Sequence, residues 1–215
     1  MKGLLVKELL NMRMYVKTMA ILIVFFLVFG IMQKSTAALM SMLTFVPVLL
    51  ILITAVNSIA MDDASKWNCY AVSMPLRRRD VVKSKYLYLI LMTICLNLIA
   101  LLIGLCFNLV FPTAEFWYSA LGLTGGICVT LFMLSISMPL LYKFGAEKSR
   151  LLIMAVIMVP SLLIGILPSV IKLPDLSAIP WEDYTWALGL LPVAFLLLYL
   201  FSYTLSVRIF SKKDL

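Results

Sequence analysis

The residues that could do chemistry in this chain are concentrated in one connection, DDASKWNCYAVSMPLRRRDVVKSKY, at positions 62–86. It combines an aspartate pair and three aromatic residues with six of the chain's eighteen Lys and Arg residues. The chain contains no histidine, which removes the most frequent general base and metal ligand. No cysteine spacing predicts a metal site, and no paired carboxylates or serine motif predict catalysis. We therefore expect no catalytic residue, no metal and no bound cofactor.

The chain is too apolar for a soluble protein. Hydrophobic residues make up 64% of its 215 positions and the mean hydropathy is +1.09, whereas a soluble domain is about 45–50% apolar. A helix needs roughly 20 apolar residues to cross the hydrocarbon core. We predict an all-α integral membrane protein with one domain over residues 1–215, an interfacial helix over 1–17 and six transmembrane helices. The predicted spans are 18–32, 37–61, 86–110, 116–141, 151–170 and 184–205.

The basic residues predict the orientation of these helices. Sixteen of the eighteen bases fall in the N-terminal segment, the second and fourth connections and the C-terminal tail, and only Lys34 and Lys172 fall on the other side. Cytoplasmic connections of membrane proteins carry such an excess of Lys and Arg. Both termini and the 62–86 connection are therefore predicted to be cytoplasmic. The same distribution assigns the net charge of +8 to membrane topology rather than to nucleic-acid binding.

The predicted spans contain no Asp, Glu, Lys or Arg. Gradient-driven carriers usually place titratable or charged groups at mid-membrane, so a secondary carrier is disfavoured but stays an alternative. Three amides, Asn57, Asn97 and Asn108, are candidates for a polar translocation surface, and interhelical hydrogen bonding is the simpler interpretation. A membrane enzyme or accessory protein is the third alternative.

The N-terminal segment predicts an amphipathic helix at the membrane surface. Leu5, Leu9, Met12 and Val16 recur at helical spacing and form one apolar stripe, with Lys7 on the opposite side. A basic amphipathic helix of this kind binds among lipid headgroups.

The 62–86 connection itself predicts a short helix followed by a break. Asp62 and Asp63 favour the start of a helix over about 62–71, where carboxylates complement the helix dipole. Trp67 and Tyr70 then lie three residues apart on one face. Ser73-Met74-Pro75 predicts the end of this helix and the start of a new one, because proline suits the first position of a helix.

This pattern resembles the first cytoplasmic loop of bacterial ABC-2 type permeases, the membrane subunits of ATP-binding-cassette exporters. The resemblance rests on the acid pair, the Trp and Tyr, and the motifs Ser-x-Pro-x-x-Arg and V-x-x-K-Y. It extends to the layout, with an N-terminal "elbow" helix, six spans and both ends inside. Compact permeases without an external domain are most similar, including exporters of antimicrobial or phenol-soluble-modulin peptides. The residues that carry the motifs are Ser73, Pro75, Arg78, Val82, Lys85 and Tyr86.

The resemblance implies a non-catalytic permease subunit in the bacterial plasma membrane. Two permease subunits, identical or related, would form a pathway for an amphipathic substrate, most simply a peptide, with a drug or ion as alternatives. Two separate ATPase subunits would bind ATP and Mg²⁺, since this chain has no phosphate-binding Walker loop. The short helix would be the coupling helix that contacts the ATPase. The implied coupling residues are Asp62, Asp63, Lys66, Trp67, Tyr70, Ser73, Pro75 and Arg78.

Overall fold

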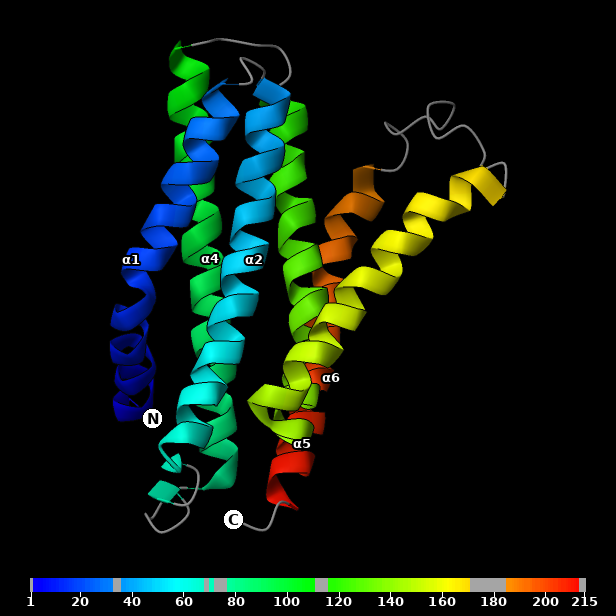
Figure 1. The fold of residues 1–215 in the computed structure, drawn as a ribbon. Helices are drawn as coiled ribbons and strands as arrows, with labels where there is room; N and C mark the ends of the chain where they lie inside the picture. The colour runs from blue at the N-terminus through cyan, green and yellow to red at the C-terminus, as the bar shows by residue number, and fades with distance from the viewer. Residues whose placement is uncertain are drawn as a thin grey trace.

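The computed structural model describes residues 2–32, 36–67, 70–71, 77–110, 116–170 and 185–212. The described residues form helices without strands, which confirms the all-α class (Figure 1). The long helices are α1 (Lys2–Met32), α2 (Thr36–Ala64), α4 (Arg78–Val110), α5 (Phe116–Val170) and α6 (Thr185–Ser211).

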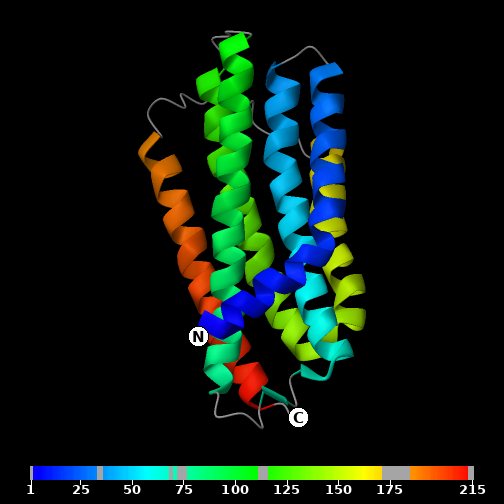
Figure 2. The same ribbon diagram turned by 90° about the vertical axis from the view of Figure 1, so that its left-hand side faces the viewer.

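Helix α4 contacts each of the other four helices, α2 contacts α1, α4 and α5, and α6 packs against α4 and α5. Figures 1 and 2 show that the start of α1, the end of α2, the start of α4 and the end of α6 all lie toward the lower end. The interior is aliphatic and dense, with Leu50, Ile51, Leu134 and Met138 almost completely buried. The chain segments on both sides of the 62–86 connection therefore meet at one end of the molecule.

Four helical stretches are long and apolar enough to cross a membrane within the described part of the chain. They are Met42–Ala64, Arg78–Cys106, Gly122–Ser149 and Leu190–Ser211, and they correspond to the second, third, fourth and sixth predicted spans. Large apolar side chains such as Leu102 and Phe201 are exposed on their outer surfaces, as expected where lipid is the solvent. The first and fifth predicted spans are helical parts of α1 and α5, and their crossing stays a prediction.

Helix α1 is continuous from Lys2 to Met32. Figure 2 shows its first part running obliquely across the lower half of the bundle before the helix turns parallel to its neighbours. Of the predicted apolar stripe, Leu9 and Val16 are exposed, whereas Leu5 and Met12 pack against the core. The sequence predicted the helix but not which side of it contacts the bundle.

Helix α5 is interrupted at Gly145, whose φ of 77° and ψ of 173° are outside the helical region. This backbone conformation is essentially restricted to glycine. The predicted connection over 142–150 is therefore reduced to one residue, and helical structure resumes at Ala146. Figure 1 shows the part after the break diverging from the bundle.

The prediction that Asp62 and Asp63 begin a short helix is wrong. Both belong to the last turn of α2, which continues to Ala64. Ser65 and Lys66 then form a turn in which Lys66 has a positive φ of 49°, a conformation that often ends helices. Helical residues follow at Trp67, Tyr70 and Ala71. Carboxylates at the end of a helix oppose its dipole, so other contacts must hold them there.

Candidate functional site

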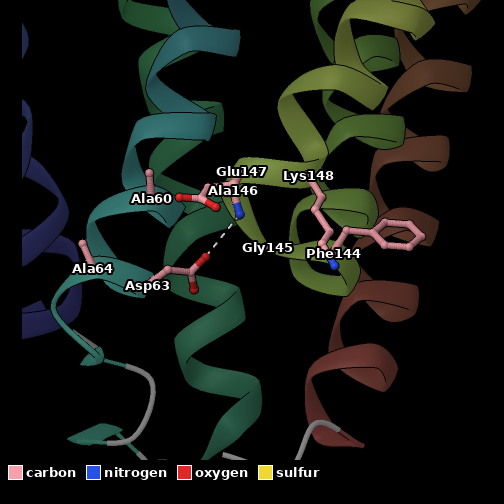
Figure 3. Close-up of a pocket in the computed structure, with 8 residues that line it drawn as sticks. All are labelled: Ala60, Asp63, Ala64, Phe144, Gly145, Ala146, Glu147 and Lys148. Atoms are coloured by element: carbon pink, nitrogen blue, oxygen red, sulfur yellow. Dashed lines mark hydrogen bonds between the residues drawn. The ribbon is translucent and has the colours of Figure 1, made fainter.

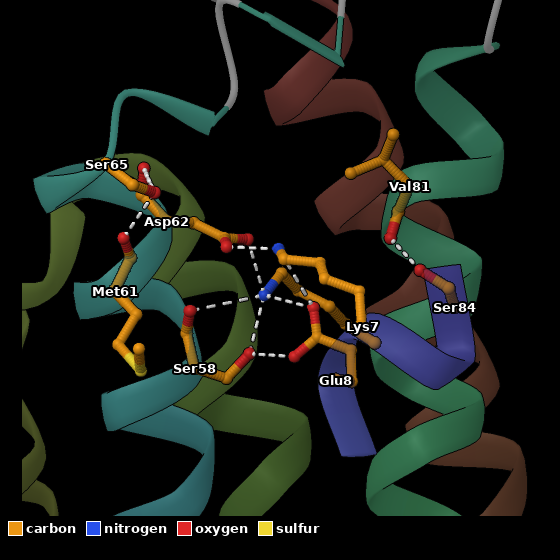
Figure 4. A network of polar contacts seen from close by, with 9 residues as sticks. Lys7, Glu8, Ser58, Met61, Asp62, Ser65, Val81 and Ser84 are labelled. Atoms are coloured by element: carbon orange, nitrogen blue, oxygen red, sulfur yellow. Dashed lines mark hydrogen bonds and ion pairs between the residues drawn. The ribbon is translucent and has the colours of Figure 1, made fainter. Parts of the chain in front are cut away.

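A cluster of four charged side chains, three of them buried and Lys7 half-buried, lies at the lower end of the bundle, where α1, α2 and α4 meet. Lys7 and Glu8 come from α1, Asp62 from α2 and Lys85 from α4. The side chains of Glu8, Asp62 and Lys85 are 3%, 2% and 4% exposed. Figure 4 shows Lys7 and Glu8 turned toward Ser58 and Asp62 on the neighbouring helix.

Lys85 is the centre of this cluster. Its Nζ lies 3.0 Å from Glu8 Oε1 and 2.7 Å from Asp62 Oδ2. It also donates hydrogen bonds to Ser58 Oγ at 2.6 Å and to the Ser58 carbonyl oxygen at 3.4 Å. The Ser58 hydroxyl in turn donates to Glu8 Oε2 at 2.6 Å. One ammonium thus links three helices.

Lys7 completes the charge balance of the cluster. Its Nζ pairs with Asp62 Oδ1 and lies 3.4 Å from Glu8 Oε1. The same ammonium is 4.5 Å from the centre of the Trp67 ring, within the range of a cation–π contact. Two positive and two negative charges therefore share one buried site. Such a set is tolerated because every charge has an opposite partner, whereas an unpaired buried charge is strongly unfavourable.

The electrostatics of Glu8 reflect this pairing. Burial by itself raises the pKa of a carboxyl group, because it disfavours the charged form. The Lys85 ammonium, the Ser58 hydroxyl and Lys7 outweigh burial, so the pKa of Glu8 lies below its ordinary value of 4.5. Glu8 is therefore held as a carboxylate at neutral pH.

Asp63 connects the end of α2 to a different helix. Its Oδ2 accepts a hydrogen bond of 3.2 Å from the Ala146 backbone N–H, immediately after the break at Gly145 (Figure 3). A carboxylate at this position caps the restarted helix. The Ser149 hydroxyl donates across the break to the Leu140 carbonyl oxygen at 2.9 Å, which stabilises the local conformation. The second part of α5 is thus bonded to the end of α2.

A pocket of about 480 Å³ opens beside this cap. It is lined by the end of α2 and by the residues of α5 on both sides of the Gly145 break, and its charged groups are Asp63, Glu147 and Lys148 (Figure 3). Phe144 at its edge is 41% exposed. The pocket lies next to the turn at residues 65–66, so it borders the connection that the sequence singled out.

Arg78 bonds the other end of the connection to α6. Its Nη1 donates to the carbonyl oxygens of Ser211 at 2.9 Å and Phe210 at 3.4 Å. Cations at the carbonyl end of a helix are favoured by the exposed carbonyl groups and by the dipole. Taken with Asp62 and Asp63, this contact means that the two ends of the connection are bonded to all five long helices, α2 included.

A buried hydroxyl network next to the charge cluster holds α4, α5 and α6 together. The Tyr86 hydroxyl lies 2.9 Å from Ser202 Oγ and 2.8 Å from Ser206 Oγ. Ser202 donates to the Ser135 carbonyl oxygen at 2.7 Å, and the Tyr199 hydroxyl donates to the Tyr86 carbonyl oxygen at 3.0 Å. Tyr86 directly follows Lys85, so the charge cluster and this network are adjacent on α4.

The remaining predicted coupling residues differ in accessibility. Lys66 is exposed, Tyr70 is 62% exposed, and Trp67 is half-buried against Lys7. Asp62, at 1% exposure, is internal, and its contacts are within the chain. Ser73 and Pro75 lie outside the described residues.

The three candidate pathway amides lie at different places. Asn97 is buried, and its Nδ2 donates to the Thr93 carbonyl oxygen of the same helix at 2.8 Å. Asn57 is half-buried and lines a small cavity beside Glu8. Asn108 is half-buried near the end of α4. Within the described residues, no group of three or more His, Cys, Asp or Glu side chains could hold a metal ion.

The sequence interpretation missed Glu8 and the inward orientation of Lys7. One signal was available: Glu8 is the only acidic residue among the first 61 positions and lies in a segment rich in bases. The hydroxyl network was also missed, although Tyr199, Ser202 and Ser206 recur at the spacing of one helix face.

Comparison with known proteins identifies the family of this chain. No curated protein and no solved structure matches it significantly. A family model described as "ABC-2 family transporter protein" matches residues 3–211, nearly the whole length. This match agrees with the apolar helices and with the predicted permease resemblance, and members of the family are membrane subunits that work with an ABC ATPase. The chain is a multi-pass membrane protein that belongs to the ABC-2 transporter family.

Proposed function

We propose that this chain is the non-catalytic permease subunit of an ATP-driven exporter in a bacterial plasma membrane. Both termini and residues 62–86 lie in the cytoplasm in this proposal, in keeping with the positive charge of these segments. The ATPase subunit supplies ATP and Mg²⁺ chemistry, and this chain converts movement of the ATPase into movement of its helices.

One observation carries the proposal: within the 62–86 connection, Asp62, Asp63 and Arg78 together contact α1, α4, α5 and α6. Asp62 contacts Lys7 of α1 and Lys85 of α4, and Asp63 contacts Ala146 of α5. Arg78 contacts the last carbonyl groups of α6. A force on this connection therefore reaches all five helices through short polar contacts rather than through apolar side chains that can slide.

The ATPase would contact the exposed part of this connection. Tyr70 and Lys66 are accessible, and the pocket beside Gly145 adds the exposed Phe144. An exposed aromatic residue surrounded by charges suits an interface, where aromatic side chains anchor and charges orient the partner. Asp62 and Lys85 then act behind the surface, by holding the connection to the helices.

The transport pathway would form between two permease subunits, identical or related. A groove of about 510 Å³ between α2 and α5 has an almost entirely apolar lining that includes Phe45, Gly122, Gly125 and Gly126. Small residues allow close approach of another surface. An apolar wall of this kind suits an amphipathic substrate such as a peptide, and drugs or ions are the alternatives for the same pathway.

The experiment that tests the proposal uses the native complex. We would purify the tagged chain gently, identify its companion by mass spectrometry, and measure substrate-stimulated ATP hydrolysis in vesicles. A stoichiometric companion with a Walker loop is expected. Tyr70→Ala should reduce stimulated hydrolysis without reducing membrane insertion, whereas Leu109→Ala, which removes an exposed side chain at the other end of α4, should have no effect. Purification of the chain alone at full yield would refute the proposal.

A further inference from the structure

The outward side of α1 forms a second surface, distinct from the charge cluster. Exposed side chains recur there every three or four positions, as they do along one face of a helix. The opposite face carries Leu4 and Glu8, which are buried against the bundle. The outward face in the first half of the helix comprises Val6, Leu9, Leu10, Arg13, Val16 and Lys17.

The composition of this outward face changes at Lys17. Between Val6 and Lys17 it is apolar with two bases, and the exposed side chains that the structure describes beyond Lys17 are apolar. The apolar continuation suits the hydrocarbon core, and long basic side chains at its boundary reach the headgroup region. The predicted span over 18–32 would place Arg13 and Lys17 at the depth of the lipid phosphates. The apolar continuation comprises Ile21, Val24, Phe25, Val28 and Phe29.

Arg13 and Lys17 are four residues apart, so they are neighbours on the same face. Within the described part of the chain neither base takes part in an ion pair, whereas Lys7 and Lys85 are paired inside the cluster. Two adjacent cations bordered by apolar side chains are complementary to one phosphate group with attached acyl chains. A soluble anion would match the charges but not the apolar surroundings.

We propose that Arg13 and Lys17 bind the headgroup phosphate of an anionic phospholipid, whose acyl chains lie along the apolar side chains of α1. Each base close to an anionic membrane surface strengthens binding about fivefold. The bound lipid contacts the face of α1 opposite Glu8 and stabilises the packing of α1 against the bundle. It thereby favours the arrangement in which Lys7 and Glu8 reach Asp62 and Lys85.

The test uses the full chain in nanodiscs of phosphatidylcholine, with and without phosphatidylglycerol. Native mass spectrometry would measure the phosphatidylglycerol retained by the chain, and thermal unfolding would measure stabilisation. The test variant is Arg13→Gln/Lys17→Gln, and Arg13→Lys/Lys17→Arg keeps both charges. Lys83→Gln/Lys212→Gln is the matched control, because it removes two exposed bases outside α1, one in α4 and one directly after α6.

Phosphatidylglycerol should stabilise the wild type more than phosphatidylcholine does, and the effect should weaken with added salt. The double Gln variant should retain about 25-fold less phosphatidylglycerol, while the charge-keeping variant and the control should behave as the wild type. Equal retention by the double Gln variant, or an equal loss in the control, would overturn the proposal. Equal stabilisation by phosphatidylcholine or by inorganic phosphate in detergent would also overturn it. ATP hydrolysis plays no part in this test, so its outcome is independent of the proposed coupling.

Discussion

The contact between Glu8 and Lys85 provides the sharpest prediction about what holds α1 to the bundle. We expect Glu8→Gln and Lys85→Met each to destabilise the protein strongly, and the double variant to recover most of the loss. Glu8→Gln leaves the cluster with one excess positive charge, and Lys85→Met leaves one excess negative charge. The double variant retains Lys7 and Asp62, which are already paired, and so restores neutrality.

The magnitude follows from the burial of the pair. Glu8 Oε1 and Lys85 Nζ are 3.0 Å apart, and both side chains are less than 5% exposed. Removing one member of such a buried pair costs roughly 3–5 kcal/mol, because the other charge loses its partner in a poorly solvated place. The double variant still disturbs the bonds of Ser58, which costs about 1–3 kcal/mol. The coupling free energy should therefore exceed about 3 kcal/mol, at the upper end of measured values.

The assay is reversible unfolding in mixed micelles, followed by tryptophan fluorescence, with the four proteins compared as a double-mutant cycle. Lys83→Gln serves as the control, because Lys83 is exposed two residues from Lys85 and its loss should change stability by less than about 0.5 kcal/mol. Single variants as stable as the wild type would refute the reasoning. So would a double variant whose loss equals the sum of the two single losses.

Three further predictions concern the same end of the bundle. Gly145→Ala should destabilise the protein by roughly 1–3 kcal/mol, because it introduces a side chain where φ is 77° and where an added Cβ would lie 3.4 Å from Asp63 Oδ2. Gly125→Ala, in open helical surroundings, should not destabilise the protein. Unfolding midpoints of the two variants would show the difference. Because the pKa of Glu8 is lowered on folding, the contribution of Glu8 to stability is complete above pH 4.5 and is lost as the pH falls through the lowered pKa. The difference in unfolding midpoint between the wild type and Glu8→Gln should therefore become smaller below pH 4.5. A difference that does not change with pH would contradict this. Arg78→Gln should lower the free energy of unfolding by about 0.3–1 kcal/mol, because it removes a cation from the end of α6. Hydrogen exchange of residues 207–211 should become faster in this variant. Arg79→Gln, which removes an exposed base, should leave the exchange of these residues unchanged.

The helices themselves could be predicted well from the sequence, because apolar length is a strong signal in a membrane protein. The predicted spans over 86–110 and 116–141 fall within α4 and the first part of α5. Prediction was weaker at the boundaries. The predicted span over 37–61 ends before Asp62, because charged side chains are normally found outside the hydrocarbon core. In the structure α2 continues through Asp63 to Ala64. Local sequence does not reveal that Lys7 and Lys85 neutralise Asp62 there.

The ATPase-coupling role of the 62–86 connection stays a prediction. Within this connection the sequence singled out Asp63 and Arg78, both of which bond other helices in the structure. It assigned Asp62 to a surface role, whereas this side chain is internal. The pairing of Glu8 could not be predicted, because its partner Lys85 is 77 positions away and α1 had to be oriented first. Pairing between distant charges depends on helix packing, and the hydrophobic pattern alone determines this only coarsely.

The adjacency of Asp62 and Asp63 explains how one connection can hold so many helices. Consecutive residues of an α-helix project about 100° apart, so two aspartates in the same turn reach different neighbours. Asp62 points to Lys85 at 2.7 Å, and Asp63 points to the Ala146 N–H at 3.2 Å. A displacement of the end of α2 by a few ångströms would break both contacts unless α1, α4 and the second part of α5 moved with it. Separation would leave charges of both signs poorly solvated, which is unfavourable by several kcal/mol. Joint movement of these helices therefore has the lower free energy, and this is the behaviour that a force-transmitting connection requires.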